Sequence, residues 1–141
     1  MRAADVLEEM RGLLQRRAEL KRRLERAKER ACGAPGIGDG MPKGNASDGA
    51  LERTVLECTA LEGDIAEIEG DLRTYRRKVQ PQIERMPTGI ARTLLTLRYC
   101  QWMSMAKMAR AAGYSYTNGY RALRNAEGLL EKLRSNENQR E

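Results

Sequence analysis

The sequence contains no histidine and no phenylalanine, and only one tryptophan and three cysteines among 141 residues. Without histidine, neither a Cys/His zinc site nor a Cys/His catalytic pair can form. Cys32, Cys58 and Cys100 are odd in number, lie far apart and include no CxxC pair, so we expect free thiols. Aromatic residues make up 4% of the chain, which argues against the large core of an enzyme.

Long apolar runs are also missing, and no stretch approaches the roughly 18 residues of a membrane-spanning helix. The opening residues, MRAADVLEEM, carry acids and lack the apolar region of a secretion signal, so we expect a cytoplasmic protein. The glycines of GAPGIGDG follow no strand pattern and do not indicate a nucleotide-binding loop. We therefore expect no metal, no cofactor, no membrane partner and no enzymatic activity.

Charge is abundant and unevenly distributed along the chain. Charged residues make up 33% of the sequence, and the formal net charge is +6. Residues 2–30, 73–98 and 107–134 are basic, whereas residues 51–71 hold seven acids and one base. The net charge favours an anionic partner such as nucleic acid. The alternation of sign indicates that the first basic segment pairs with the acidic one.

Helical spacing of apolar residues divides the first half into two long segments. The first seam comprises Val6, Met10, Leu13, Leu20, Leu24, Ala27 and Ala31, and the second comprises Leu51, Cys58, Leu61, Ile65, Ile68, Leu72, Tyr75 and Val79. The intervening glycines and prolines predict a flexible loop at residues 32–49. Residues 1–80 are thus predicted to form an antiparallel, coiled-coil-like helical hairpin. This arm is a structural or dimerising device, a nucleic-acid contact, or a protein-binding element.

Pro81 and Pro87 predict a linker at residues 81–87, followed by a three-helix module at residues 88–134 and a disordered tail at 135–141. In the module, Ser104 and Ser115 are predicted helix caps, and Gly113 is a predicted helix stop. A short helix, a glycine-containing turn and a longer helix make a helix-turn-helix candidate. The expected fold class is therefore all-α, a helical hairpin followed by a helix-turn-helix module.

The last helix has one apolar stripe and one polar face. The polar face carries Tyr116, Thr117, Asn118, Arg121, Arg124 and Asn125, which are residue types that contact base edges and phosphates. Tyr120 lies on the apolar stripe, and we expect it in the core. The small Ala109 suits a close crossing of the last two helices. Trp102 is expected to pack under the turn.

The C-terminal segment resembles a known family. LRYCQWMS (Leu97 to Ser104), Met108–Ala109, GYS (Gly113 to Ser115), Tyr120–Arg121 and the closing leucines are similar to the C-terminal helix-turn-helix of small phage transcription regulators. That module is itself similar to region 4 of bacterial sigma factors. The resemblance implies DNA contacts by Ser115, Tyr116, Thr117, Tyr120 and Arg121, and a partner RNA polymerase in a bacterial host cell. Gly119 lies where that pattern has a bulky aliphatic residue. This departure predicts that the last helix begins later or is packed loosely against the rest of the module.

The leading hypothesis is a phage- or prophage-encoded DNA-binding transcription regulator, a homodimer through its helical arm. The candidate DNA-binding residues are Ser115, Tyr116, Thr117, Asn118, Arg121, Arg124 and Asn125. A small terminase-like subunit that recognises phage DNA for packaging is the first alternative. The second is a coiled-coil adaptor that binds protein instead of DNA.

Overall fold

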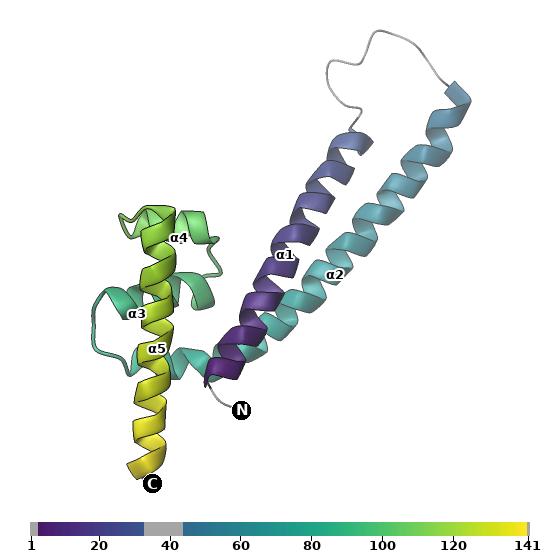
Figure 1. The fold of residues 1–141 in the computed structure, drawn as a ribbon. Helices are drawn as coiled ribbons and strands as arrows, with labels where there is room; N and C mark the ends of the chain where they lie inside the picture. Colours follow the sequence, from purple (N-terminus) through teal and green to yellow (C-terminus); the bar gives the residue numbers. More distant parts are fainter. Residues whose placement is uncertain (1–2, 33–43, 141) are drawn as a thin grey trace. The chain divides into compact units, whose positions relative to one another are not determined.

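The computed structural model describes residues 3–32 and 44–140, and every regular element in this part of the chain is a helix (Figure 1). The elements in order are α1 (Ala3–Ala31), α2 (Gly44–Glu84), α3 (Ile90–Leu95), the π-helix η1 (Thr96–Cys100), α4 (Met105–Ala111) and α5 (Tyr116–Arg140). The predicted all-α class is therefore confirmed for the described residues.

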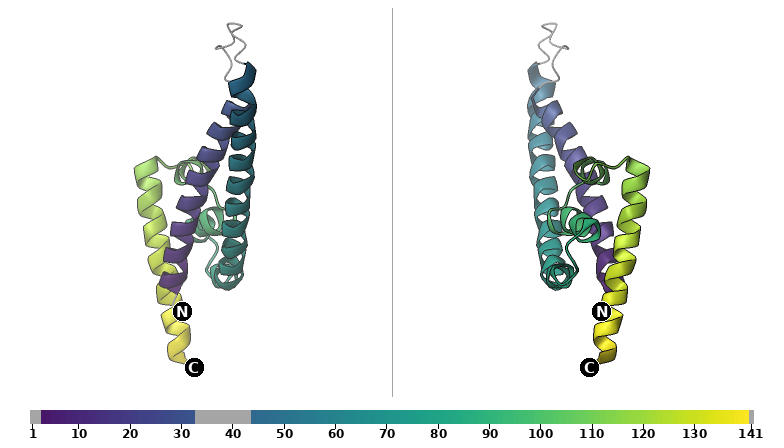
Figure 2. Two further views of the ribbon diagram at one scale, coloured as in Figure 1. Left: turned by 90° about the vertical axis from the view of Figure 1, so that its right-hand side faces the viewer. Right: turned by 90° about the vertical axis from the view of Figure 1, so that its left-hand side faces the viewer.

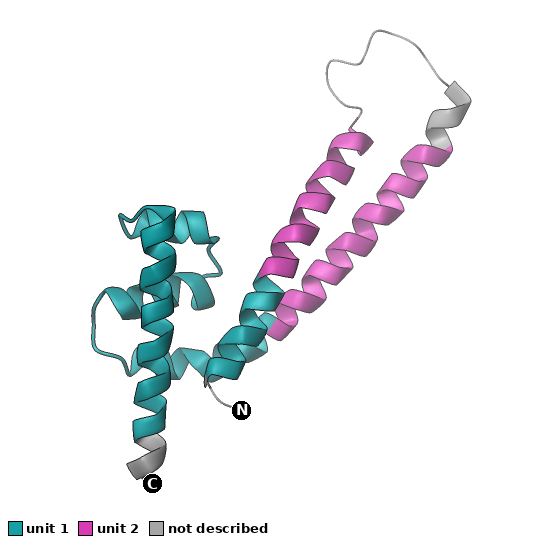
Figure 3. Ribbon diagram, viewed as in Figure 1, with its two compact units in different colours: residues 1–14, 72–141 teal, residues 15–71 magenta. Residues whose placement is uncertain are grey.

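The chain divides into two compact units, which Figure 3 colours separately. Unit 1 consists of residues 1–14 and 72–141, and unit 2 consists of residues 15–71. Both α1 and α2 therefore contribute to both units. The division falls inside these two helices, whereas the sequence placed the domain boundary after residue 80.

In unit 2, α1 and α2 run side by side in opposite directions (Figure 2). Arg17 Nε lies 2.7 Å from Glu69 Oε2, and Arg30 Nη2 lies 3.0 Å from Glu57 Oε2. Surface ion pairs of this kind contribute about 0–1 kcal/mol each. Apolar burial contributes more to stability, so the buried aliphatic residues stabilise the contact between the two helices. The ion pairs mainly favour the antiparallel orientation of α1 and α2. The buried aliphatic residues are Leu20, Ala27, Leu61, Ile65 and Ile68.

The apolar seam of α2 is buried over a shorter length than its heptad pattern predicts. Leu51 is 49% exposed, and the next seam residue, Cys58, is half-buried. Arg30, near the end of α1, pairs with Glu57, so Leu51 lies about 9 Å beyond that ion pair along α2. The heptad pattern therefore extends beyond the part of α2 that is buried against α1.

Three predicted irregular segments are helical in part. Of the predicted loop at 32–49, residues 33–43 lie outside the described part of the chain, and residues 44–49 form the start of α2. The predicted tail at 135–141 is helical as far as Arg140, and residue 141 is not described. The sequence has no proline or glycine after Gly128, so no residue type interrupts α5 beyond that point.

The predicted linker at 81–87 is wrong for its first four residues, because α2 continues through Pro81 to Glu84. A proline inside a helix removes one hydrogen bond and costs about 3 kcal/mol. Val79 and Ile83 on either side are each 1% exposed, and burying two such side chains contributes about 3–6 kcal/mol. Apolar burial thus outweighs the helix-breaking tendency of Pro81.

The core of unit 1 is built by short helices packed on α5. Tyr99 of η1 and Met108 of α4 are fully buried, and so are apolar residues in the first part of α1, the last part of α2 and the middle of α5. The core includes Val6, Leu7, Met10, Leu14, Leu72, Val79, Ile83, Met86, Leu94, Leu95, Ala109, Leu123, Ala126 and Leu130. Ile90, Leu129 and Leu133 have apolar helical spacing but are 38–48% exposed.

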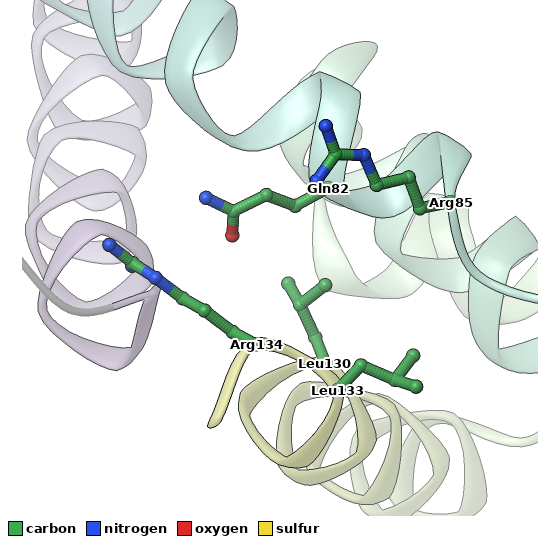
Figure 4. Close-up of a pocket in the computed structure, with 5 residues that line it drawn as sticks. All are labelled: Gln82, Arg85, Leu130, Leu133 and Arg134. Carbon is green, nitrogen blue, oxygen red and sulfur yellow. The ribbon is translucent and has the colours of Figure 1, made fainter. Parts of the chain in front are cut away.

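A small cavity in unit 1 lies between α2 and α5 (Figure 4). It measures about 30 Å³ and is lined by Gln82, Arg85, Leu130, Leu133 and Arg134. A cavity needs about 10–15 Å³ of such volume to hold one water molecule, so this one has room for about two waters and is too small for a substrate or cofactor. We therefore do not assign it a ligand.

α4 and α5 approach each other closely at Ala109 and Gly119. A Cβ atom placed on Gly119 would lie 2.6 Å from Ala109 Cβ and 3.2 Å from Ala109 Cα. Only glycine fits this position without a shift of the helices. α5 begins at Tyr116, three residues before Gly119, so the expectation that Gly119 delays the helix is wrong.

We predict that Gly119→Ala destabilises the protein. Overpacking costs about 1–3 kcal/mol, which exceeds the roughly 0.5–1 kcal/mol that alanine contributes inside a helix. Gly128→Ala on the same helix is the matched control, because a Cβ there meets nothing within 4 Å. Urea unfolding followed by circular dichroism should show a lower free energy of unfolding for Gly119→Ala. For Gly128→Ala the free energy of unfolding should rise by about 0.5–1 kcal/mol. Equal stability of the two variants would contradict the close helix approach.

Candidate nucleic-acid interface

The turn between α4 and α5 has defined caps at both ends. Ser104 Oγ accepts a hydrogen bond from Lys107 N at 3.2 Å, and Ser115 Oγ accepts one from Asn118 N at 3.2 Å. Both predicted caps are therefore confirmed. They satisfy backbone amides that a helix start leaves without an intrahelical partner.

The predicted helix stop at Gly113 is confirmed as well. Gly113 has φ +78°, a left-handed conformation that glycine adopts without Cβ strain. Its backbone N donates to Arg110 O at 3.1 Å, and Tyr114 N donates to Ala109 O at 2.8 Å. This pair of bonds is a Schellman motif, which ends α4 and reverses the chain toward α5.

α5 presents one face to the core of unit 1 and the other to solvent. Gly119, Leu123, Ala126 and Leu130 are buried. All seven candidate DNA-binding residues are exposed, namely Ser115, Tyr116, Thr117, Asn118, Arg121, Arg124 and Asn125. The structure therefore brings them together over the first three turns of one helix.

Two of these residues already have partners within the protein. Ser115 Oγ is the helix cap described above. Arg124 donates through Nε and Nη2 to Tyr120 Oη at 3.1 and 2.9 Å, and its guanidinium carbon lies 5.0 Å from the centre of the Tyr120 ring. The hydrogen bond with Tyr120 raises the pKa of Arg124. By contrast, Arg121 makes no hydrogen bond or ion pair with any described residue.

Tyr120 is 42% exposed, so its expected place in the core is wrong. Successive residues of an α-helix are about 100° apart around its axis. Gly119 points directly at α4, and Tyr120 is consequently turned to the edge of the buried face. There its ring and hydroxyl hold the side chain of Arg124.

Glu127 is a buried carboxylate that sequence analysis did not single out. It is 9% exposed and accepts hydrogen bonds from Arg11 Nη1 at 2.6 Å, Tyr99 Oη at 3.0 Å and Arg124 Nη1 at 3.3 Å. These donors come from α1, η1 and α5. A carboxylate in the middle of the apolar stripe between Ala126 and Leu130 was the signal that could have revealed it.

Trp102 lies between η1 and α4 in a left-handed conformation, with φ 56°. This conformation is uncommon for a residue other than glycine. The guanidinium of Arg76 lies 4.8 Å from the centre of the Trp102 ring, and Arg76 Nη1 donates to Cys100 O at 3.1 Å. Arg76 therefore links the end of α2 to the segment that precedes α4.

The described residues include no group of three or more acidic or cysteine side chains arranged to hold a metal ion. None of the described helices has an apolar stretch long enough to span a bilayer. No protein-family model matches the chain, and neither a curated protein nor a solved structure matches it significantly.

We predict that Glu127→Gln lowers the free energy of unfolding by about 2 kcal/mol, because hydrogen bonds to a charged group contribute about 1.5–3 kcal/mol. The substitution keeps the size of the side chain and leaves Arg11 and Arg124 facing a neutral amide. Glu9→Gln, on an exposed position of α1, is the control and should change stability by less than about 0.5 kcal/mol. Urea unfolding measures both. A loss no larger than that of the control would contradict a structural role for Glu127.

We also predict a loss of stability at alkaline pH. Burial, reinforced by the Glu127 carboxylate, raises the pKa of the Tyr99 phenol above its ordinary value of about 10. Above pH of about 10 the unfolded chain releases this proton, whereas the folded protein keeps it. The contribution of Tyr99 to the stability of the folded state is therefore complete below pH of about 10 and decreases above it. Urea unfolding gives the free energy of unfolding at each pH from about 9 to about 11. This free energy should fall less steeply with pH in Tyr99→Phe than in the unmodified protein. Identical slopes would disprove the assignment to Tyr99.

Proposed function

We propose that the protein is a DNA-binding transcription regulator in which α4, the following turn and α5 form a helix-turn-helix. The observation that carries this proposal is an exposed helix face in a region without acids. Residues 85–126 include seven basic residues and no carboxylate. A surface of this kind attracts the phosphate backbone, and the neighbouring carboxylate, Glu127, is buried and paired with Arg11.

The exposed face of α5 has the side chains needed to read bases. Asn118, Arg121 and Asn125 follow one another at steps of three and four residues, so they form a row along the helix. Arginine pairs with guanine and asparagine with adenine in the major groove. In this proposal the row contacts base edges, and Arg124 supplies charge because Tyr120 holds its guanidinium.

The start of α5 is suited to positioning on the backbone. Tyr116 and Thr117 are exposed in its first turn. Hydroxyl groups and the free amides of a helix N-terminus bind phosphate oxygens without reading sequence. We assign Tyr116 and Thr117 to contacts with the DNA backbone, and the row of Asn118, Arg121 and Asn125 to contacts with the bases.

The proposal extends to the architecture and the setting. The long antiparallel helices serve as an arm through which two copies pair, and the helix-turn-helix is the C-terminal module. Several of the small phage regulators that the C-terminal segment resembles also carry a helical N-terminal extension, which supports the arrangement but not the pairing of two copies. RNA polymerase in a bacterial cytoplasm is the second partner that this resemblance implies.

A protein-binding adaptor is the second candidate, and one observation favours it. An open groove of about 380 Å³ in unit 1 is lined mainly by apolar side chains, including Met86, Pro87, Ile90, Leu129 and Leu133. Exposed apolar patches often mark protein contacts.

A DNA-packaging subunit is distinguished by its stoichiometry, since a ring of many copies in native mass spectrometry would favour it over a dimeric regulator.

The test uses two substitutions that remove one positive charge each from α5. Selection from a random duplex library identifies a preferred site, and fluorescence anisotropy then measures binding across a salt series. Arg121→Gln should weaken binding to that site by about 1–3 kcal/mol and relax the preference for one base. Lys132→Gln is the control, because Lys132 is exposed on the same helix about 16 Å farther along.

The proposal fails if the unmodified protein binds no duplex at low salt. It also fails if the two variants bind alike, since loss of net charge alone would then account for the effect. Both substitutions affect exposed side chains, so thermal unfolding should be unchanged and misfolding is not expected to obscure the comparison.

A further inference from the structure

A hollow in unit 2 gathers three guanidinium groups. It measures about 160 Å³ and is lined by Arg23, Arg26 and Arg30 of α1 and by Glu57 of α2. The arginines are spaced by three and four residues, which places them on one face of the helix. Three cations and one carboxylate line the hollow, and Glu19 outside the lining pairs with Arg23, so one positive charge remains in excess.

The contacts of these arginines leave that charge available. Arg30 pairs with Glu57 at 3.0 Å, and Arg23 pairs with Glu19 at 2.7 Å, with all four side chains about half exposed. Arg26 Nε donates only to the backbone oxygen of Arg22, at 3.4 Å, and Arg26 contacts no carboxylate of the described residues. Exposed ion pairs of this kind are weak, so an incoming anion can compete for the guanidinium groups.

We propose that this hollow binds phosphate groups of a nucleic-acid backbone, as a contact that does not depend on sequence. The planar fork of arginine matches phosphate oxygens and forms bidentate hydrogen bonds with them. The inference rests in part on the proposed function, which supplies the nucleic acid. It adds a second binding surface, on a unit that the helix-turn-helix hypothesis leaves without a DNA contact.

The length of the basic row argues for a polymer over a free phosphate. Arg16 is exposed and lies seven residues before Arg23, so it continues the same face of α1. From Arg16 to Arg30 the row extends about 21 Å. Successive phosphates along one strand of a duplex are separated by about 3.4 Å of helix axis, so a row of this length faces several of them.

The test compares two double variants that each remove two positive charges from α1. Arg23→Gln with Arg26→Gln alters the hollow. Lys21→Gln with Lys28→Gln is the matched control, because both lysines are exposed on another face of the helix. Arg30 is kept in both variants, since it joins α1 to α2 through Glu57.

Binding of the full chain to a random-sequence duplex is measured by anisotropy from about 50 to about 200 mM salt. Each lost phosphate contact lowers the salt slope by about 0.9. We expect the arginine variant to lose about two units of slope and to bind roughly tenfold more weakly at the lowest salt. The lysine variant should stay close to the unmodified protein. Equal behaviour of the two variants would overturn the inference.

Arg121→Gln separates this inference from the proposed function. If Arg121→Gln loses sequence preference while the two double variants bind alike, the inference fails and the proposed function stands. If Arg121→Gln behaves like the unmodified protein while the arginine variant loses slope, the inference stands and the proposed function fails. Absence of duplex binding by the unmodified protein overturns both.

Inorganic tripolyphosphate tests the source of the phosphate groups. We expect it to bind the unmodified protein far more weakly than the duplex does, because it spans only part of the basic row. Binding as tight as that of the duplex, with the same dependence on Arg23 and Arg26, would overturn the assignment to nucleic acid and identify a polyphosphate site.

Discussion

The buried carboxylate of Glu127 is the interaction on which the organisation of unit 1 depends. It accepts hydrogen bonds from Arg11 of α1, Tyr99 of η1 and Arg124 of α5. A carboxylate removed from water costs several kcal/mol unless charged or hydroxyl donors compensate it. α5 can therefore bury this residue only when the first turns of α1 and the end of η1 are in place. Residues 1–14 belong to unit 1 for this reason as well as for their apolar packing.

The same network distinguishes the two arginines on the exposed face of α5. Arg124 forms hydrogen bonds with both Glu127 and Tyr120. Arg121 lies three residues earlier on the helix and has no hydrogen-bond or ion-pair partner among the described residues. Arg11, at 2.6 Å, is the nearer cation to Glu127, and Arg124 lies 3.3 Å from the same carboxylate oxygen. A buried acid thus lies beneath a basic surface without cancelling the attraction of that surface for an anion.

Charge separation along the chain gives each segment a different role. The acids of residues 51–71 include Glu57 and Glu69, which pair with arginines of α1. The region from residue 85 to residue 126 has no acid, and Lys107, Arg110 and Arg121 in it have exposed side chains that form no ion pair with a described residue. Because α1 has more arginines than its contacts with α2 use, part of its basic surface is also available. Both proposed binding surfaces follow from this imbalance.

Local chemistry was enough to predict the helical class, the two long helices, the Ser104 and Ser115 caps and the Gly113 stop. Periodicity of 3.6 residues, hydroxyl caps and left-handed glycine act over a few neighbouring residues, so they are legible in the sequence. The candidate DNA-binding residues were likewise found on the exposed face, because helical spacing specifies which residues share a side. The continuation of α2 through Pro81 was not predicted, since the burial that offsets it involves residues from other helices.

Contacts between distant segments decided the rest. Gly119 looked like a weak point of the last helix, and only the position of Ala109 shows that it permits the close crossing of α4 and α5. Tyr120 and Leu129 follow the apolar spacing but are exposed, because helix packing covers a narrower strip than the pattern suggests. Two of the three partners of Glu127, Tyr99 and Arg11, come from positions 28 and 116 residues away. Pairings over such separations depend on how the helices pack, and no local pattern encodes them.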